Sequence, residues 1–309
     1  MTTLAVHLFG RFALRYQELA LEGLDARKAQ ELLCYLLLHR DRPHARESLV
    51  GLLWGDYSSA LSKKYLRQTL WQLQTVLDAS TDADGQQLLM SEPDWLQINP
   101  HVHFWLDVAV FEQNYNRLIG IPAQMLDAPS AERLNETVQL YQGDLLEGWY
   151  QDWCLYERER LQNMYLSLLD KLVDYYEVQQ AYETGLAYAQ RLLQYDGARE
   201  RTHRRLMRLY CLRGDRTAAL RQYERCAFAL DKELGVRPSA RTLALYEQIR
   251  ADWLKSPDVL PANIAPSPET SSPVMDVLAH LKEFQTTLTD IQRRVQQEIN
   301  ALEHFLMSR

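Results

Sequence analysis

Residues 61–77, LSKKYLRQTLWQLQTVL, combine cations, amides and an aromatic ring at helical spacing. At about 100° per residue the leucines form one stripe that is expected to pack against a core, comprising Leu66, Leu70, Leu73 and Leu77. The opposite face presents Lys64, Gln68, Trp71 and Thr75, flanked by Arg67 and Gln72. Such cations, amides and rings contact phosphates and base edges in a DNA major groove, although Lys and Gln also occur on helix faces that are simply solvated.

The neighbouring segments favour the DNA-binding interpretation of this helix. Strand-like runs over 4–9, 12–16 and 19–21 precede two predicted helices over 26–39 and from 46 to about 54. Two short apolar runs follow the helix and flank a polar turn, which predicts a hairpin over 88–98. Strands, three helices and a hairpin in this order are typical of a helix-turn-helix domain with a wing.

Several motifs give the chain a family resemblance. They are the opening Leu8-Phe9-Gly10-Arg11-Phe12, the stretch from Leu36 to Asp56, the leucine spacing above, Tyr141-Gln142-Gly143-Asp144-Leu145-Leu146, and Lys232-Glu233-Leu234-Gly235-Val236-Arg237-Pro238-Ser239. Over about residues 4–254 the sequence resembles the SARP-type bacterial transcriptional activators. That family joins an OmpR-like winged helix to an all-helical bacterial transcriptional activation domain.

The resemblance implies a site for polymerase contacts, and it also shows where this chain differs from the family. It implies polymerase contacts in the turn before the recognition helix, here Asp56, Tyr57, Ser58 and Ser59. The family usually carries arginines in the second half of that helix, where this chain has Gln72, Gln74 and Thr75. Glu92 and Asp94 at the expected wing tip would repel phosphates, so we expect a modest affinity for DNA.

Charge restricts how such a domain could hold DNA. The chain of 309 residues has a net charge of −7, and residues 1–105 hold ten Lys or Arg against twelve Asp or Glu. Binding must therefore depend on local patches of cations, with Arg40 and Arg42 available beside them. The expected DNA contacts are Lys63, Lys64, Arg67, Gln68, Trp71, Gln72, Thr75 and Arg46.

The second half of the chain is predicted to be helical throughout. A shift of 34 residues aligns Tyr176 with Tyr210 and Gln180 with Gly214, which is the tetratricopeptide period. The first copy lacks the turn glycine of the second. Stacked repeats of this kind leave a concave groove and are most often protein-binding platforms.

The C-terminal region has two further patterns. Its prolines predict a semi-extended linker over 256–273. Apolar residues then follow a heptad-like spacing over 274–309, which predicts an amphipathic, coiled-coil-like helix. We expect this helix to pair with its copy in a second subunit and so form a homo-oligomer, although it could instead fold back on the repeats or dock another protein.

Enzyme, cofactor and membrane patterns find little support. The sequence lacks GxxxxGK, HExxH and GxSxG motifs, and His101 and His103 have no clustered Cys or acidic partner, so neither a cofactor nor a metal is expected. Cys34, Cys154, Cys211 and Cys226 lack CxxC spacing and indicate buried thiols. Without a signal pattern or a long apolar run, we expect a cytoplasmic protein that does not enter membranes.

These inferences predict a mainly α fold with four parts. They are a winged-helix DNA-binding domain over 1–105, a tetratricopeptide-like bacterial transcriptional activation domain over 106–255, the linker over 256–273 and the helix over 274–309. The expected function is sequence-specific regulation of transcription, through double-stranded DNA and recruitment of RNA polymerase. The alternative is a protein-interaction scaffold whose winged helix has lost DNA binding.

Overall fold

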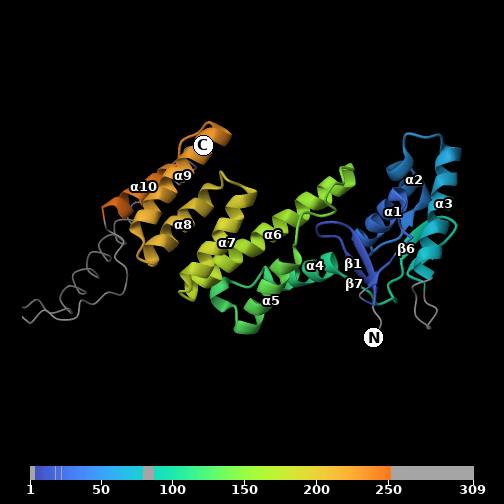
Figure 1. Cartoon of the computed structure of the whole chain (residues 1–309), viewed down its shortest axis with the longest axis horizontal. Helices are drawn as coiled ribbons and strands as arrows, with labels where there is room; N and C mark the ends of the chain where they lie inside the picture. Colours follow the sequence, from blue (N-terminus) through green and yellow to red (C-terminus); the bar gives the residue numbers. More distant parts are fainter. Residues whose placement is uncertain (1–3, 18, 22, 79–86, 252–309) are drawn as a thin grey trace, which may run out of the picture. The chain divides into compact units, whose positions relative to one another are not determined.

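The computed structural model describes residues 4–251 except for positions 18, 22 and 79–86. The predicted linker over 256–273 and helix over 274–309 lie outside the described residues and stay predictions. Within the described residues the chain is mainly helical, with two small sheets formed by residues 4–106, so the predicted fold class is confirmed (Figure 1).

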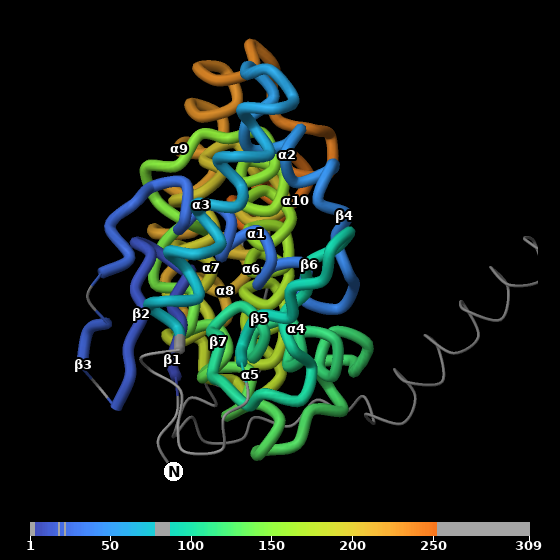
Figure 2. Tube along the Cα trace, turned by 90° about the vertical axis from the view of Figure 1, so that its right-hand side faces the viewer, coloured from blue at the N-terminus to red at the C-terminus, as the bar shows by residue number. Residues whose placement is uncertain are grey.

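The N-terminal sheet contains a strand from beyond the wing. Figure 2 shows its strands in the order β3-β2-β1-β7. The central strand β1 pairs antiparallel with β2 and parallel with β7. The expected domain boundary between residues 105 and 106 therefore falls inside a strand of this sheet. The bounds are β1 Leu4–His7, β2 Ala13–Tyr16, β3 Leu19–Ala20 and β7 Trp105–Leu106.

Three helices and a second sheet complete the winged helix. The helices are α1 Arg27–Leu38, α2 Arg46–Trp54 and α3 Ser59–Asp78, and they pack together beside β6 (Figure 1). The strands β4 His44–Ala45, β5 Leu89–Ser91 and β6 Trp95–Ile98 form a sheet in the order β4-β6-β5. Buried leucines of the three helices share one core with Leu96 and Ile98 of β6, so the hairpin and helices support one another.

Helices then follow one another along the chain. Each of α6 to α9 packs against the next helix, and α10 packs against both α8 and α9. Figure 1 shows this succession in green to orange. The bounds are α4 Asp107–Leu118, the short 3₁₀ helix η1 Ala123–Met125, α5 Ala128–Leu140, α6 Asp152–Val178, α7 Tyr182–Tyr195, α8 Glu200–Leu212, α9 Arg216–Leu234 and α10 Ala240–Arg250.

The helix ends reproduce the predicted repeat. The ends of α6 and α8, and the starts of α7 and α9, are both separated by 34 residues. Gly214 takes a positive φ of 86° in the second turn, and Gln180 takes 57° at the equivalent place in the first. The amides of Ala181 and Asp215 close both turns in the same way, onto Tyr176 and Tyr210. The backbone of the turn is thus kept where the glycine is missing.

Two motif segments that carry the family resemblance pair with each other. The amide of Gly10 donates to the carbonyl of Asp144 at 2.9 Å, and the amide of Leu146 donates to the carbonyl of Leu8 at 2.8 Å. Between them, the ring of Phe9 lies 4.8 Å from that of Tyr141. The start of the winged helix is therefore bonded through its backbone to the helical half of the chain.

Asp107, the first residue of α4, strengthens this junction. Its buried carboxylate accepts the amides of Leu8 at 2.8 Å, Phe9 at 2.9 Å and Val108 at 2.7 Å. Burial raises the pKa of Asp107, while the three amides act in the opposite direction. These bonds supply acceptors for two amides just beyond the end of β1 that would otherwise be buried without partners.

Arg158 of α6 holds the loop that follows the junction. Its guanidinium donates to the carbonyl oxygens of Leu145, Leu146 and Trp149, each at 2.9 Å. On the other side of this loop, the guanidinium of Arg27 in α1 lies 3.8 Å from the ring centroid of Trp149. A helix from each half of the chain thus fixes the same loop.

Candidate nucleic-acid interface

The leucine side of α3 is buried as predicted. Leu66, Leu70, Leu73 and Leu77 all belong to the core cluster, against α1 and α2. Every third or fourth residue is anchored in this way, so the rotation of the helix about its axis is fixed. The opposite side chains must point away from the core.

That outer face is open to solvent. Lys64, Arg67 and Gln68 are exposed, and Gln72 is half-buried. Trp71 lies between them with 68% of its surface exposed, so most of its ring is open to solvent. Within the described residues neither Lys64 nor Arg67 forms an ion pair, so both cations are available to an anionic partner.

Three predicted DNA contacts have partners within the domain. Lys63 forms an exposed ion pair with Glu47, 3.1 Å apart, and this hydrogen bond lowers the pKa of Glu47. The guanidinium of Arg46 donates to the carbonyl oxygen of Glu92 and to the hydroxyl of Ser91, both at 2.8 Å. Arg46 therefore joins the start of α2 to the wing. The third residue, Thr75, donates its hydroxyl to the carbonyl of Trp71.

The turn before α3 is exposed and well supported. Asp56, Tyr57, Ser58 and Ser59 are all solvent-exposed. Beneath the turn, the buried hydroxyl of Ser62 lies 3.0 Å from the carbonyl oxygen of Trp54 and 3.1 Å from that of Ser58. The ring of Tyr57 contacts Tyr65 edge-on, with centroids 5.3 Å apart. These contacts give the exposed turn a fixed shape.

The other candidate chemistry is not assembled in the described part of the chain. No group of three metal-ligating side chains occurs there, and His101 and His103 are exposed. None of the four cysteines there is in a disulfide, and all are buried except for the half-buried Cys211. Each helix of the described segments is too short or too polar to cross a membrane.

Comparisons with known proteins address the helical half first. Residues 106–250 match the family model of the bacterial transcriptional activator domain. This family belongs to transcriptional regulators and is not a family of enzymes. A comparison with curated proteins gives no match.

A solved structure shares the fold of both halves. It is Mycobacterium tuberculosis EmbR in complex with a low-affinity phosphopeptide, 18% identical, with a TM-score of 0.64. The similarity covers 82% of this chain and 66% of the EmbR chain, which is just under two thirds of EmbR. Together with the activator domain, this fold confirms the predicted resemblance to SARP-type bacterial transcriptional activators.

Proposed function

We propose that this activator-domain protein binds DNA sequence-specifically through α3 and recruits RNA polymerase. The exposed face around Trp71, opposite a fully buried leucine stripe, is the observation that carries the proposal. Because one side of the helix is buried in the core, the opposite side presents a defined set of side chains to a DNA groove. The fold, a winged helix followed by an activator domain, agrees with this function.

Each side chain of the face has a separate proposed role. Gln68 and Gln72 make hydrogen bonds to base edges, for which their amides offer both a donor and an acceptor. Lys64 and Arg67 bind phosphates or guanine, and Trp71 contacts thymine methyls or the sugar-phosphate wall. Lys63, Arg46 and Thr75 take part only after exchanging their present partners for DNA.

We further propose that the turn of Asp56, Tyr57, Ser58 and Ser59 contacts RNA polymerase. The supporting observations are its exposure and the hydrogen bonds beneath it. A fixed turn next to the recognition helix can touch a second protein while the helix occupies DNA. The proposed homo-oligomer through 274–309 would place two such units on one operator.

The test uses fragments selected from random DNA with the full-length chain, followed by two variants. We expect Arg67→Ala to lower affinity by about 1–3 kcal/mol at one base position if it contacts guanine, or equally for all sequences if it contacts phosphate. Tyr57→Ala is expected to leave DNA affinity unchanged and to abolish activation of transcription in a reconstituted assay with RNA polymerase.

Arg225→Ala, on the exposed surface of α9, is the matched control for the loss of one arginine. It is expected to bind DNA as the unaltered chain does. If Arg67→Ala and Lys64→Ala both leave the affinity for every selected fragment unchanged, α3 does not contact DNA. If Tyr57→Ala activates transcription normally, the turn is not the polymerase contact.

The second candidate function is a scaffold that docks a protein through the face of α3. The acidic wing tip with Glu92 and Asp94, together with the Lys63–Glu47 ion pair, favours it because both reduce attraction for phosphates. Failure to enrich any fragment from random DNA, with a folded chain, would support this scaffold and contradict the proposed regulator.

A further inference from the structure

A basic groove crosses the face of the repeats formed by α6, α8 and α10. Its cavity of about 850 Å³ lies within the usual size range for ligand sites. Five arginines line it, four of them on α8 at helical spacing: Arg201, Arg204, Arg205, Arg208 and Arg241. Only two acidic side chains, Asp174 and Glu177, line it with them. The groove therefore carries an excess of positive charge in a chain of net charge −7.

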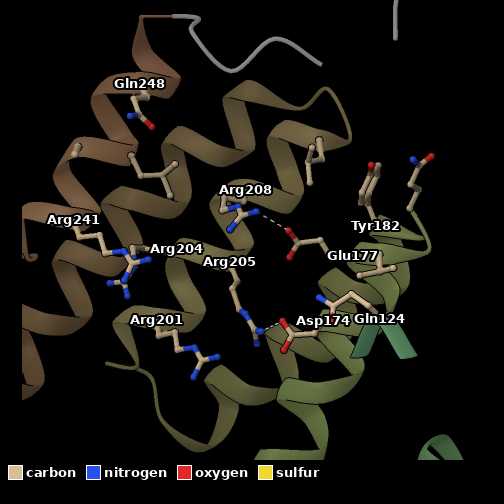
Figure 3. A pocket seen from close by; sticks show the side chains of 15 residues that line it. Gln124, Asp174, Glu177, Tyr182, Arg201, Arg204, Arg205, Arg208, Arg241 and Gln248 are labelled. Atoms are coloured by element: carbon tan, nitrogen blue, oxygen red, sulfur yellow. Dashed lines mark hydrogen bonds and ion pairs between the residues drawn. The ribbon is translucent and has the colours of Figure 1, made fainter. Parts of the chain in front are cut away.

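The two sides of the groove differ in charge. On the α6 side, Arg205 pairs with Asp174 and Arg208 pairs with Glu177 at 2.9 Å. Figure 3 shows Arg201, Arg204 and Arg241 on the other side, away from these carboxylates. In the described residues Arg201 and Arg241 form no ion pair, and both are exposed. The unneutralised charge is thus concentrated along α8 and the start of α10.

Apolar side chains also line this groove. Val178, Tyr182, Leu212 and Leu245 line the same groove. Arginine pairs strongly with carboxylates, and neighbouring like charges on one helix face repel each other until an anion neutralises them. A ligand that fits must offer carboxylates toward Arg201 and Arg241 and apolar groups toward the remaining surface. An acidic peptide has both.

We infer that this groove binds an acidic peptide segment of a partner protein, with its Asp or Glu side chains on Arg201 and Arg241; Arg204 between them already pairs with Glu200 at 3.6 Å. Duplex DNA fits less well because Asp174 and Glu177 would face its phosphates, and because the cavity is far smaller than a duplex. The site is separate from α3, so the helical repeats would select a protein partner independently of the operator.

The test measures fluorescence anisotropy with the full-length chain and a pool of labelled twelve-residue peptides. In the pool, Asp or Glu alternates with Leu, Val, Ala or Tyr, and a matched pool carries Asn or Gln in place of the acids. We expect saturable binding of the acidic pool only, weakened by salt. The double reversal Arg201→Glu with Arg241→Glu is expected to reduce affinity about tenfold or more and to favour a lysine-bearing pool.

Arg221→Glu with Arg225→Glu is the matched control, since both residues are exposed on α9, which does not line the groove. It changes the net charge equally and is expected to keep the affinity for the acidic pool. Equal loss in both double variants, equal binding of the amide pool, absence of saturable binding, or displacement of the peptide by duplex DNA would each overturn the inference. Loss of DNA binding through α3 would leave these results unchanged.

Discussion

Gln180 occupies a backbone conformation that glycine adopts more easily. Its φ of 57° costs a non-glycine residue about 1 kcal/mol or more. Glycine would remove this cost, but it would also raise the conformational entropy of the unfolded chain, which offsets part of the gain in stability. We expect Gln180→Gly to raise the free energy of unfolding by about 0.5–1 kcal/mol. Urea denaturation of the full-length chain measures the difference.

The neighbouring residue gives the control for this substitution. Gln179 has an ordinary φ of −77°, so Gln179→Gly relieves no strain and is expected to lower the free energy of unfolding by about 0.5–1 kcal/mol. A destabilised Gln180→Gly variant would mean that contacts of the glutamine side chain outweigh the backbone strain.

At the scale of single residues, the sequence predicted which side chains are buried better than it predicted which polar side chains contact each other. The burial of Leu66, Leu70, Leu73 and Leu77 follows from helical periodicity alone. The partners of Lys63 and Arg46 do not, because Glu47 and the wing approach them only after α2, α3 and the hairpin pack. The arginine groove was missed for the same reason, since α10 contributes Arg241 from 33 to 40 residues beyond the four arginines of α8.

Asp107 links two elements, the end of β1 and the start of α4. Asp107→Ala would leave the buried amides of Leu8 and Phe9 without an acceptor, at about 1–3 kcal/mol each. We therefore expect thermal unfolding at a clearly lower temperature, corresponding to a loss of about 2–4 kcal/mol.

Asp152 provides the comparison because it is also the first residue of a helix but is exposed. Asp152→Ala removes only a favourable charge near the helix N-terminus, worth about 0.3–1 kcal/mol. Similar losses in the two variants would show that the amide contacts of Asp107 add nothing to an ordinary helix start.

Most individual elements could be predicted from the sequence, but their long-range pairing could not. The predicted strand 4–9 and helix 61–77 correspond to β1 and α3 within a few residues. The pairing of Leu8 and Gly10 with residues 144–147 joins segments more than 130 positions apart, which local periodicity cannot reveal. Two of the motifs behind the family resemblance thus meet for a structural reason.

For the whole molecule, the charge distribution predicts that the DNA-binding constant falls only moderately as the salt concentration rises. Among the described residues, Lys64 and Arg67 are the cations of α3 that form no ion pair. Lys63 and neighbouring arginines lie beside them, so we expect three to five phosphates to be neutralised per subunit. The logarithm of the binding constant should then fall with the logarithm of salt concentration at a slope of about −3 to −4.5.

Titrations at several salt concentrations measure this slope, and the Arg201→Glu with Arg241→Glu variant should retain it. A slope near zero would contradict phosphate contacts by α3. A smaller slope in the groove variant would mean that the helical repeats also touch the DNA backbone.

The backbone bonds of Gly10 and Leu8 to Asp144 and Leu146 also bear on swapping recognition modules between regulators. A chimaera that contains only residues 1–105 of this chain would lose those backbone hydrogen bonds and expose the ring of Phe9. We therefore expect such a chimaera to aggregate. Transferring residues 1–149 as one piece would keep these backbone hydrogen bonds and the contact between the rings of Phe9 and Tyr141.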